Sequence, residues 1–97
     1  MIIIRVQMQV QPEYKSKFLA LLGQEAQEVR RLQGCSRFDI FKHSSEENTL
    51  LLYEEWQTLG AFDAYRTSEA FRQNGEKLFS MMAGKPDSAY YSAEVFS

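Results

Sequence analysis

The sequence is poor in the residues that build covalent cross-links and metal sites. Its 97 residues include a single cysteine, Cys35, and a single histidine, His43. One thiol forms no intramolecular disulfide, and these two residues supply no cluster with the spacing of a metal site. We therefore expect no bound metal. A chain this small without cross-links commonly gains stability by oligomerisation.

Long apolar runs and blocks of one charge are also missing. No segment reaches the roughly 20 apolar residues of a membrane-spanning helix. The opening residues MIIIRVQMQV lack the basic start and small-residue cleavage site of a signal peptide. Eleven Lys and Arg are scattered among 13 Asp and Glu, for a net charge of −2. We expect neither a membrane nor a nucleic acid as partner, and a lone thiol favours the cytoplasm.

Apolar residues recur with the two periods of regular secondary structure. Alternation with period two predicts strands, and spacing of three and four predicts amphipathic helices. Pro12 suits a first helical turn, whereas Gly34, Gly84 and Pro86 suit helix ends. The expected strands are Ile2–Val10, Cys35–His43, Thr49–Gln57 and Ala89–Phe96. The expected helices are Pro12–Leu32, Thr58–Tyr65, and one capped by Thr67 or Ser68 that buries Phe71, Leu78, Phe79 and Met82.

This order of elements predicts one domain over residues 1–97 with the α+β ferredoxin-like fold. That fold is a βαββαβ arrangement in which helices cover one face of a four-stranded antiparallel sheet. The uncovered face would be partly apolar, and such a face usually binds a partner. We expect a second copy of the chain there. The contributing side chains are Ile3, either Cys35 and Phe41 or Phe38 and Ile40, and either Leu51 and Tyr53 or Leu50 and Leu52.

The stretch from Leu50 to Phe71, LLLYEEWQTLGAFDAYRTSEAF, is the richest in chemistry. Alternation places Glu54 and Trp56 on one face of the expected strand. Phe62 and Tyr65 are three residues apart, so the two rings share one side of the following helix. A carboxylate, an indole and a phenol near one strand-to-helix corner can line a pocket for a small molecule.

Glu54 and Tyr65 are the candidate catalytic residues. Tyr65 in an apolar pocket can donate a hydrogen bond to a substrate oxygen, or act as a base if its pKa falls. The alternative is a core or interface tyrosine with a hydrated hydroxyl. Burial of Glu54 would raise its pKa towards the value of a useful general base. The alternative is a structural ion pair with Arg37 or Arg5 across the sheet.

Four further residues are candidates for substrate binding. Trp56 and Phe62 can form pocket walls, although Trp56 equally suits a core anchor. Arg37 can hold an anionic oxygen, or form a surface pair with Asp39, which is two residues away on the same strand face. Gly75 on the last helix marks space kept for a ligand, or a close approach of helix and sheet.

Residues 34–71 resemble the antibiotic biosynthesis monooxygenase domain family, and the likeness extends over nearly the whole chain. The resemblance is carried by Gly34-Cys35, by Glu54 with Trp56, by Ala61-Phe62 and by the segment from Thr67 to Phe71. It implies a dimeric α/β barrel with a pocket between sheet and helices in each subunit. In several members it implies oxygenation of quinols or polycyclic phenols without metal, flavin or haem.

Several histidines that relatives carry are absent from this chain. Many carry histidine where Tyr65 and Ala70 stand, and the haem-degrading branch needs an axial histidine where Gly75 stands. We therefore expect no haem. An isomerase of a phosphorylated quorum-sensing signal is also similar, across Arg37-Phe38-Asp39 and Tyr53-Glu54.

Three functional hypotheses follow. The first is a cofactor-independent monooxygenase that takes a quinol or polycyclic phenol and dioxygen. Tyr65 and Glu54 would then handle protons, Trp56 and Phe62 would form the pocket wall, and Arg37 would stabilise an anion. The second is an isomerase of a small, phosphorylated carbonyl compound, which needs no oxygen. The third is a non-catalytic ligand-binding dimer, which would bind without turnover.

Overall fold

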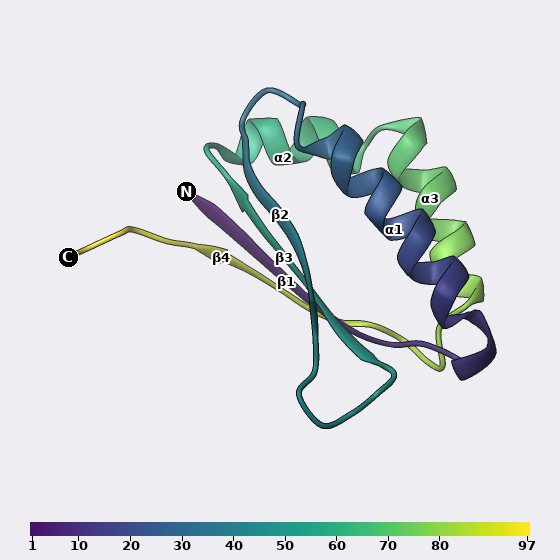
Figure 1. Ribbon diagram of the computed structural model, residues 1–97. Coiled ribbons are helices and arrows are strands. Elements are labelled where there is room, and N and C mark those ends of the chain that lie inside the picture. Colours follow the sequence, from purple (N-terminus) through teal and green to yellow (C-terminus); the bar gives the residue numbers. More distant parts are fainter.

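One sheet and one layer of helices make up the fold, and the computed structural model describes all residues from 1 to 97 (Figure 1). The elements, in chain order, are β1 (Ile2–Gln9), the 3₁₀ helix η1 (Pro12–Tyr14), α1 (Lys15–Val29), β2 (Cys35–Lys42), β3 (Thr49–Trp56), α2 (Leu59–Arg66), α3 (Glu69–Ser80) and β4 (Asp87–Ser92). No helix is both long enough and apolar enough to cross a membrane.

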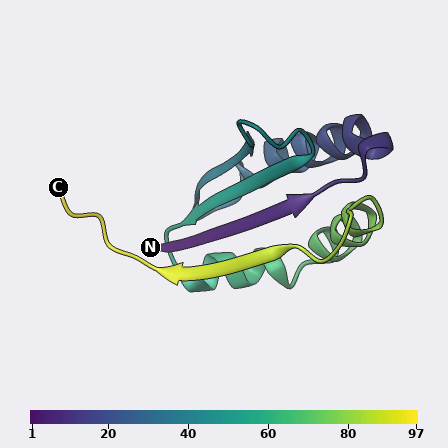
Figure 2. The same ribbon diagram turned by 90° about the horizontal axis from the view of Figure 1, so that it is seen from below.

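The four strands form one antiparallel sheet in the order β2-β3-β1-β4. Figure 2 shows these strands side by side, with the chain beyond β4 leading away from the sheet. All the helices lie on one face of the sheet, and the opposite face is uncovered (Figure 1). This topology confirms the ferredoxin-like prediction.

Two of the predicted elements are shorter in the structure by more than one residue. The helix expected over Pro12–Leu32 begins with a 3₁₀ turn and its α-helical part ends at Val29. The Arg30 amide still binds the Ala26 carbonyl, but the amides of residues 31 and 32 form only turns, and Leu32 is exposed. The strand expected over Ala89–Phe96 runs instead from Asp87 to Ser92, where Ser92 pairs with Ile2. Ala93 exchanges the last hydrogen bonds with Met1.

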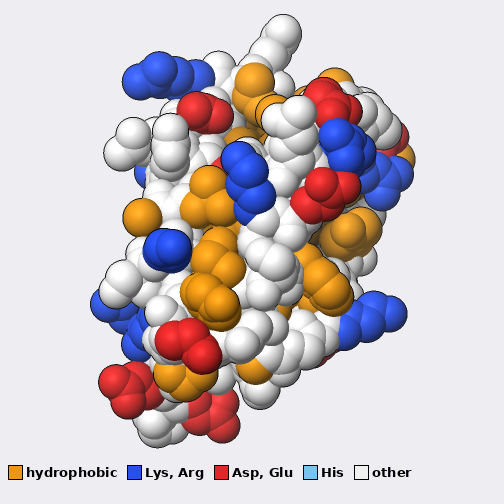
Figure 3. Space-filling model, turned by 90° about the vertical axis from the view of Figure 1, so that its right-hand side faces the viewer, with side chains coloured by type: hydrophobic (Ala, Val, Ile, Leu, Met, Phe, Trp, Pro, Cys, Tyr) orange, Lys and Arg blue, Asp and Glu red, His pale blue; other side chains and the backbone are white.

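The core fills the space between the sheet and the helices. Trp56, Phe18 and Phe38 are its largest fully buried side chains. Leu78 is buried as predicted, but Phe79 is 56% exposed and Phe71 is 37% exposed, so their expected burial is wrong. Both rings border a cavity, and Phe71 also packs against Tyr65. Figure 3 views the side of the molecule that carries the helices, where hydrophobic side chains reach the surface among charged ones.

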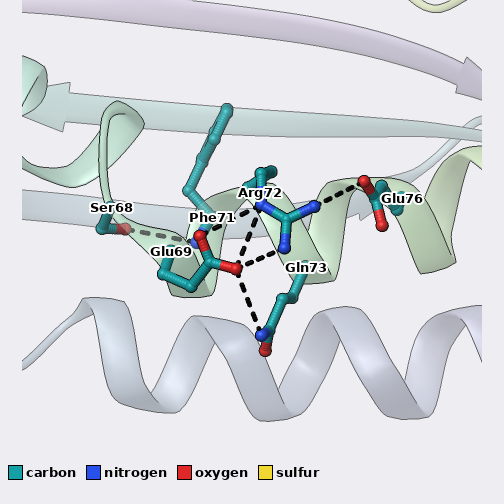
Figure 4. A network of polar contacts seen from close by, with 6 residues as sticks. All are labelled: Ser68, Glu69, Phe71, Arg72, Gln73 and Glu76. Carbon is teal, nitrogen blue, oxygen red and sulfur yellow. Dashed lines mark hydrogen bonds and ion pairs between the residues drawn. The ribbon is translucent and has the colours of Figure 1, made fainter.

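Side-chain caps set the limits of the two short helices. Thr58 accepts a hydrogen bond from the amide of Ala61 at 3.1 Å, which begins α2. Ser68 accepts one from the amide of Phe71 at 3.2 Å, which begins α3 and selects Ser68 over Thr67 as its cap. Figure 4 shows this cap beside Arg72, which pairs with Glu69 and Glu76 on the exposed side of α3. Tyr65 therefore lies in the last turn of α2, directly before this junction.

Candidate functional site

Glu54 is buried on the sheet face that the helices cover. The alternation of β3 directs Leu50, Leu52, Glu54 and Trp56 towards the helices, and all four are buried. The Glu54 carboxylate accepts a hydrogen bond from the indole Nε1 of Trp56 at 2.9 Å. The predicted alternative of an ion pair with Arg5 or Arg37 is wrong, because those arginines pair with Asp87 and Asp39. Glu54 is thus a buried carboxylate whose partner is neutral.

Burial raises the pKa of Glu54 to about 7. The charged form is disfavoured in an apolar environment, and the nearby Glu25 carboxylate acts in the same direction. The hydrogen bond from Trp56 opposes both effects because it favours the carboxylate. Near neutral pH the residue is therefore present in both protonation states, which suits a general base that later returns its proton.

Tyr65 belongs to a cluster of aromatic rings and donates its hydroxyl proton to Glu25, with 2.7 Å between Oη and Oε2. Its ring stacks on Trp56 with centroids 5.3 Å apart and planes inclined by 20°. Phe38 and Phe71 complete the packing in T-shaped contacts with Tyr65, at centroid distances of 6.2 and 5.1 Å. Burial and the charge of Glu25 raise the pKa of Tyr65. Tyr65 therefore stays protonated near neutral pH, so a role as an ionised base does not apply.

Glu25 on α1 is the site residue that the sequence reasoning missed. It is buried on the apolar stripe that Leu22, Ala26 and Val29 form. Burial raises the pKa of Glu25, whereas the Tyr65 hydroxyl and the Asn74 amide act in the opposite direction. The one available signal was its spacing, since Glu25 follows Leu22 by three residues and precedes Val29 by four.

A cavity of about 200 Å³, here called the inner cavity, lies between the sheet and the helices. Its lining is mainly apolar and includes the Glu54 carboxylate, with Glu25 and Tyr65 at its helix wall. Phe62 also lines it and packs against Trp56 and Tyr90, with ring centroids 5.9 and 5.5 Å apart. A small apolar ligand in this space would meet two carboxyl groups, from Glu25 and Glu54, and two phenols, from Tyr65 and Tyr90.

A second and larger hollow of about 690 Å³, here called the outer cleft, lies between α1 and the segment from Gln57 to Asn74. Several of its lining side chains are amides, namely Gln33, Gln57 and Asn74. Glu25 and Tyr65 are the only residues that line both hollows.

The remaining predicted site residues lie in different places. Trp56 is fully buried behind Tyr65 and lines neither hollow, so it supports the site as a core anchor. Gly75 is an exposed residue at the edge of the inner cavity, and a Cβ there would meet no atom within 4 Å. Arg37 lies opposite Glu55 in the sheet register and pairs with Asp39 at 3.6 Å. It therefore faces away from Glu54, and the structure does not bring it to the cavity.

The sheet, its single helix layer and the apolar cavity between them define a ferredoxin-like α+β protein with a carboxylate-bearing pocket. The family model described as "Antibiotic biosynthesis monooxygenase" matches residues 1–77. The chain belongs to this family, which confirms the resemblance seen in the sequence.

Individual proteins are similar to this chain in sequence or in fold. The Bacillus subtilis (strain 168) protein named "Putative monooxygenase YcnE" is 28% identical over 83 residues, which cover 82% of this chain and 87% of that protein. A solved structure from Deinococcus radiodurans has a TM-score of 0.93 at 21% identity and covers 100% of this chain and 96% of its own. SnoaB, a cofactor-independent oxygenase from Streptomyces nogalater, has a TM-score of 0.86 at 14% identity, covering 98% and 94%. These two solved structures share the fold.

Proposed function

We propose that this protein is a cofactor-independent monooxygenase that oxygenates a quinol or a small phenol in the inner cavity. The observation that carries the proposal is Glu54, a buried carboxyl group with a pKa of about 7 at the wall of an apolar cavity. Membership of the monooxygenase family supports the reaction class. The name of SnoaB, which states that it needs no cofactor, supports the absence of one here.

The size of the inner cavity favours a substrate of one or two rings. Pockets for drug-sized ligands usually have about 300–1,000 Å³, and this cavity has about 200 Å³. A naphthalenediol is therefore a better candidate than a phenol with three or more fused rings. Apolar walls and the ring of Phe62 suit a flat aromatic ligand.

The proposed reaction begins when Glu54 removes the proton of a phenolic hydroxyl. The electron-rich phenolate then transfers one electron to dioxygen, and the resulting radical pair joins at a ring carbon to give a peroxide. The O–O bond breaks as that carbon loses its hydrogen as a proton, which the terminal peroxide oxygen takes up so that it leaves as hydroxide. The leaving hydroxide takes the proton held by Glu54 and departs as water. For 1,4-naphthalenediol the sum is diol plus O₂ to hydroxynaphthoquinone plus water, so the substrate itself supplies all the electrons.

The isomerase alternative finds less support. A phosphorylated substrate needs a cation near the base, and neither the inner cavity nor the outer cleft is lined by Lys, Arg or His. Arg37, the cation that the sequence suggested, pairs with Asp39 on the opposite side of the sheet. The lining of the inner cavity is better matched to a neutral aromatic compound.

The test is oxygen uptake with 1,4-naphthalenediol and related one- and two-ring quinols, without added cofactor and corrected for autoxidation. The expected result is saturable uptake that falls about 10²–10⁴-fold in Glu54→Gln, the usual contribution of a general base. Glu55→Gln is the matched control, because Glu55 points to the other side of the sheet and contacts Tyr53. Uptake that never exceeds background, or an equal rate in Glu54→Gln, would contradict the proposal.

We also propose that two copies of the chain pair through their uncovered sheet faces. This face carries Phe41, which is 48% exposed, together with apolar or aromatic neighbours at Ile3, Leu51, Tyr53 and Tyr91. Burial of such a surface stabilises association. Sedimentation should give twice the chain mass, and Phe41→Glu should give the single-chain mass. A monomer at all protein concentrations would contradict this pairing.

A further inference from the structure

The inner cavity and the outer cleft meet at one hydrogen-bonded pair of side chains. Tyr65 on α2 and Glu25 on α1 are the only residues common to both linings, and their side chains are joined at 2.7 Å. This O–H···O contact therefore links the two hollows through protein groups. Both groups can carry a proton, because a phenol donates and accepts while a carboxylate accepts.

We propose that Tyr65 and Glu25 form a proton relay between a hydroxyl of a phenolic ligand in the inner cavity and water in the outer cleft. The proposal rests on the proposed function, and it assigns a second proton pathway to the same site. The ligand hydroxyl passes its proton to Tyr65 Oη while the Tyr65 proton moves to Glu25 Oε2. No electron moves in this step, and Tyr65 is neutral before and after it.

The surroundings of Tyr65 fit a fixed relay group. Stacking on Trp56 and the edge of Phe71 hold the ring between the two hollows. The hydroxyl uses its proton in the bond to Glu25, which leaves its oxygen lone pairs free to accept a bond from a ligand. Because Tyr65 resists ionisation, it can release its proton to Glu25 only while it takes up a proton from the ligand.

The groups around Glu25 allow it to hold the transferred proton. Those that face it are Tyr65 from α2, Asn74 from α3, Glu28 from its own helix and Glu54 from β3. None of these carries a positive charge, and burial already favours the protonated carboxyl group. Glu25 also borders the outer cleft, from which water can take up or return the proton.

A quinol gives this relay a chemical purpose, because it has two hydroxyl groups. Glu54 on the sheet accepts one proton, and the relay at the helix wall accepts the other. When a hydroxyquinone forms, its new hydroxyl needs a proton, which the same path can return. Two acids on opposite walls of the inner cavity thus match a substrate with two acidic O–H groups better than a monophenol.

The experiment is a stopped-flow pH jump with 4-nitrophenol bound to the full protein in oxygen-free buffer, where absorbance reports ionisation of the bound phenol. In Glu25→Gln the amide oxygen can still accept a hydrogen bond from Tyr65, but the amide cannot take up the Tyr65 proton. We expect proton exchange to slow by about tenfold or more in Glu25→Gln and in Tyr65→Phe, which is a modest part of the usual acid–base contribution. The loss in exchange rate should exceed any loss in affinity for 4-nitrophenol, because Tyr65→Phe also removes a hydrogen bond to the ligand. Glu25→Asp should recover part of the rate.

Glu28→Gln is the matched control, since Glu28 lies on the same helix and lines the outer cleft only. Wild-type exchange rates in either Glu25→Gln or Tyr65→Phe, with the fold intact by circular dichroism, would overturn the relay. Failure of the wild type to bind 4-nitrophenol would overturn it too. The measurement needs no oxygenation, so a relay without oxygen uptake would refute only the proposed function. Turnover that depends on Glu54 but not on Glu25 would refute only the relay.

Discussion

Trp56 and Tyr65 stack on each other, and the polar end of each ring donates to a different carboxylate. The indole Nε1 of Trp56 binds Glu54, and the hydroxyl of Tyr65 binds Glu25. One stacked pair thereby positions two buried acids that come from β3 and α1. Buried acids without cationic partners are costly to ionise, so their environment sets when each carries a proton.

The stability of the protein should fall as the pH rises through the range in which Glu54 ionises. Its pKa is about 7 in the folded state and has an ordinary value of 4.5. The folded state therefore binds the proton more tightly, and this contribution is complete below about pH 4.5 and lost as the pH passes about 7. A pKa difference of this size corresponds to about 3 kcal/mol in the free energy of unfolding.

Urea unfolding at pH 4.5 and pH 8, at one protein concentration, measures this effect. Between these two pH values the free energy of unfolding of Glu54→Gln should fall by about 3 kcal/mol less than that of the wild type. Some dependence should remain in the variant, because burial raises the pKa of Glu25 as well. Equal pH dependence of the two proteins would show that Glu54 is not the group responsible.

Trp56→Phe should raise the pKa of Glu54 further. The indole Nε1 donates to the carboxylate and lowers its pKa, and phenylalanine lacks that donor. The protonated carboxyl band in infrared difference spectra should therefore persist to a higher pH than in the wild type. Phe18→Leu, a large-to-small change elsewhere in the core, is the control for general loosening. A lower or unchanged pKa in Trp56→Phe would contradict the role given to the indole.

Substitution of Gly75 should separate helix stability from ligand binding. A Cβ at Gly75 or at Gly23 meets no atom within 4 Å, so alanine at either position should stabilise its helix by about 0.5–1 kcal/mol. Leucine at Gly75 would reach into the inner cavity, whereas leucine at Gly23 would not, because Gly23 lines neither hollow. We expect Gly75→Leu to weaken naphthalenediol binding about tenfold or more, a loss typical of a blocked contact. Equal affinity in Gly75→Leu and Gly23→Leu would place the ligand elsewhere.

Gly34 holds the chain close to α2 in a conformation that other residues avoid. Its φ is +88°, and a Cβ there would lie 2.4 Å from the Cβ of Ala61. Gly34→Ala should therefore lower the free energy of unfolding by more than the roughly 1–3 kcal/mol that backbone strain alone would cost. Gly84→Ala is the control, because Gly84 also has a positive φ but meets nothing within 4 Å. Ala61→Gly should restore part of the loss in a double variant, and failure to do so would rule out the predicted clash.

The fold was predictable because local signals and global packing agree. Alternation in β1 and β3, and the caps at Thr58 and Ser68, are each visible in the sequence and present in the structure. Helix and strand ends were less predictable, because they depend on partners that lie far away in the chain. The strand β4 ends at Ser92, which pairs with Ile2, and Ala93 adds one last pair of hydrogen bonds to Met1.

The candidate site was predictable only in part. Glu54, Phe62 and Tyr65 do line one cavity. The placement of Arg37 depended on which face of β2 turns inward, and both faces carry apolar residues. A bulge between Cys35 and Arg37 further changes the register, a feature with no clear sequence signal. Glu25 was missed because a charged residue in a helix is usually exposed.

The pH dependence of kcat/KM for naphthalenediol oxygenation most directly tests Glu54 as the general base. The wild-type rate should rise with pH as Glu54 ionises, with an apparent pKa of about 7 for this acidic limb. In Glu54→Gln that limb should vanish along with most of the activity. An acidic limb with the same midpoint in Glu54→Gln would assign the base to another group and contradict the proposed mechanism.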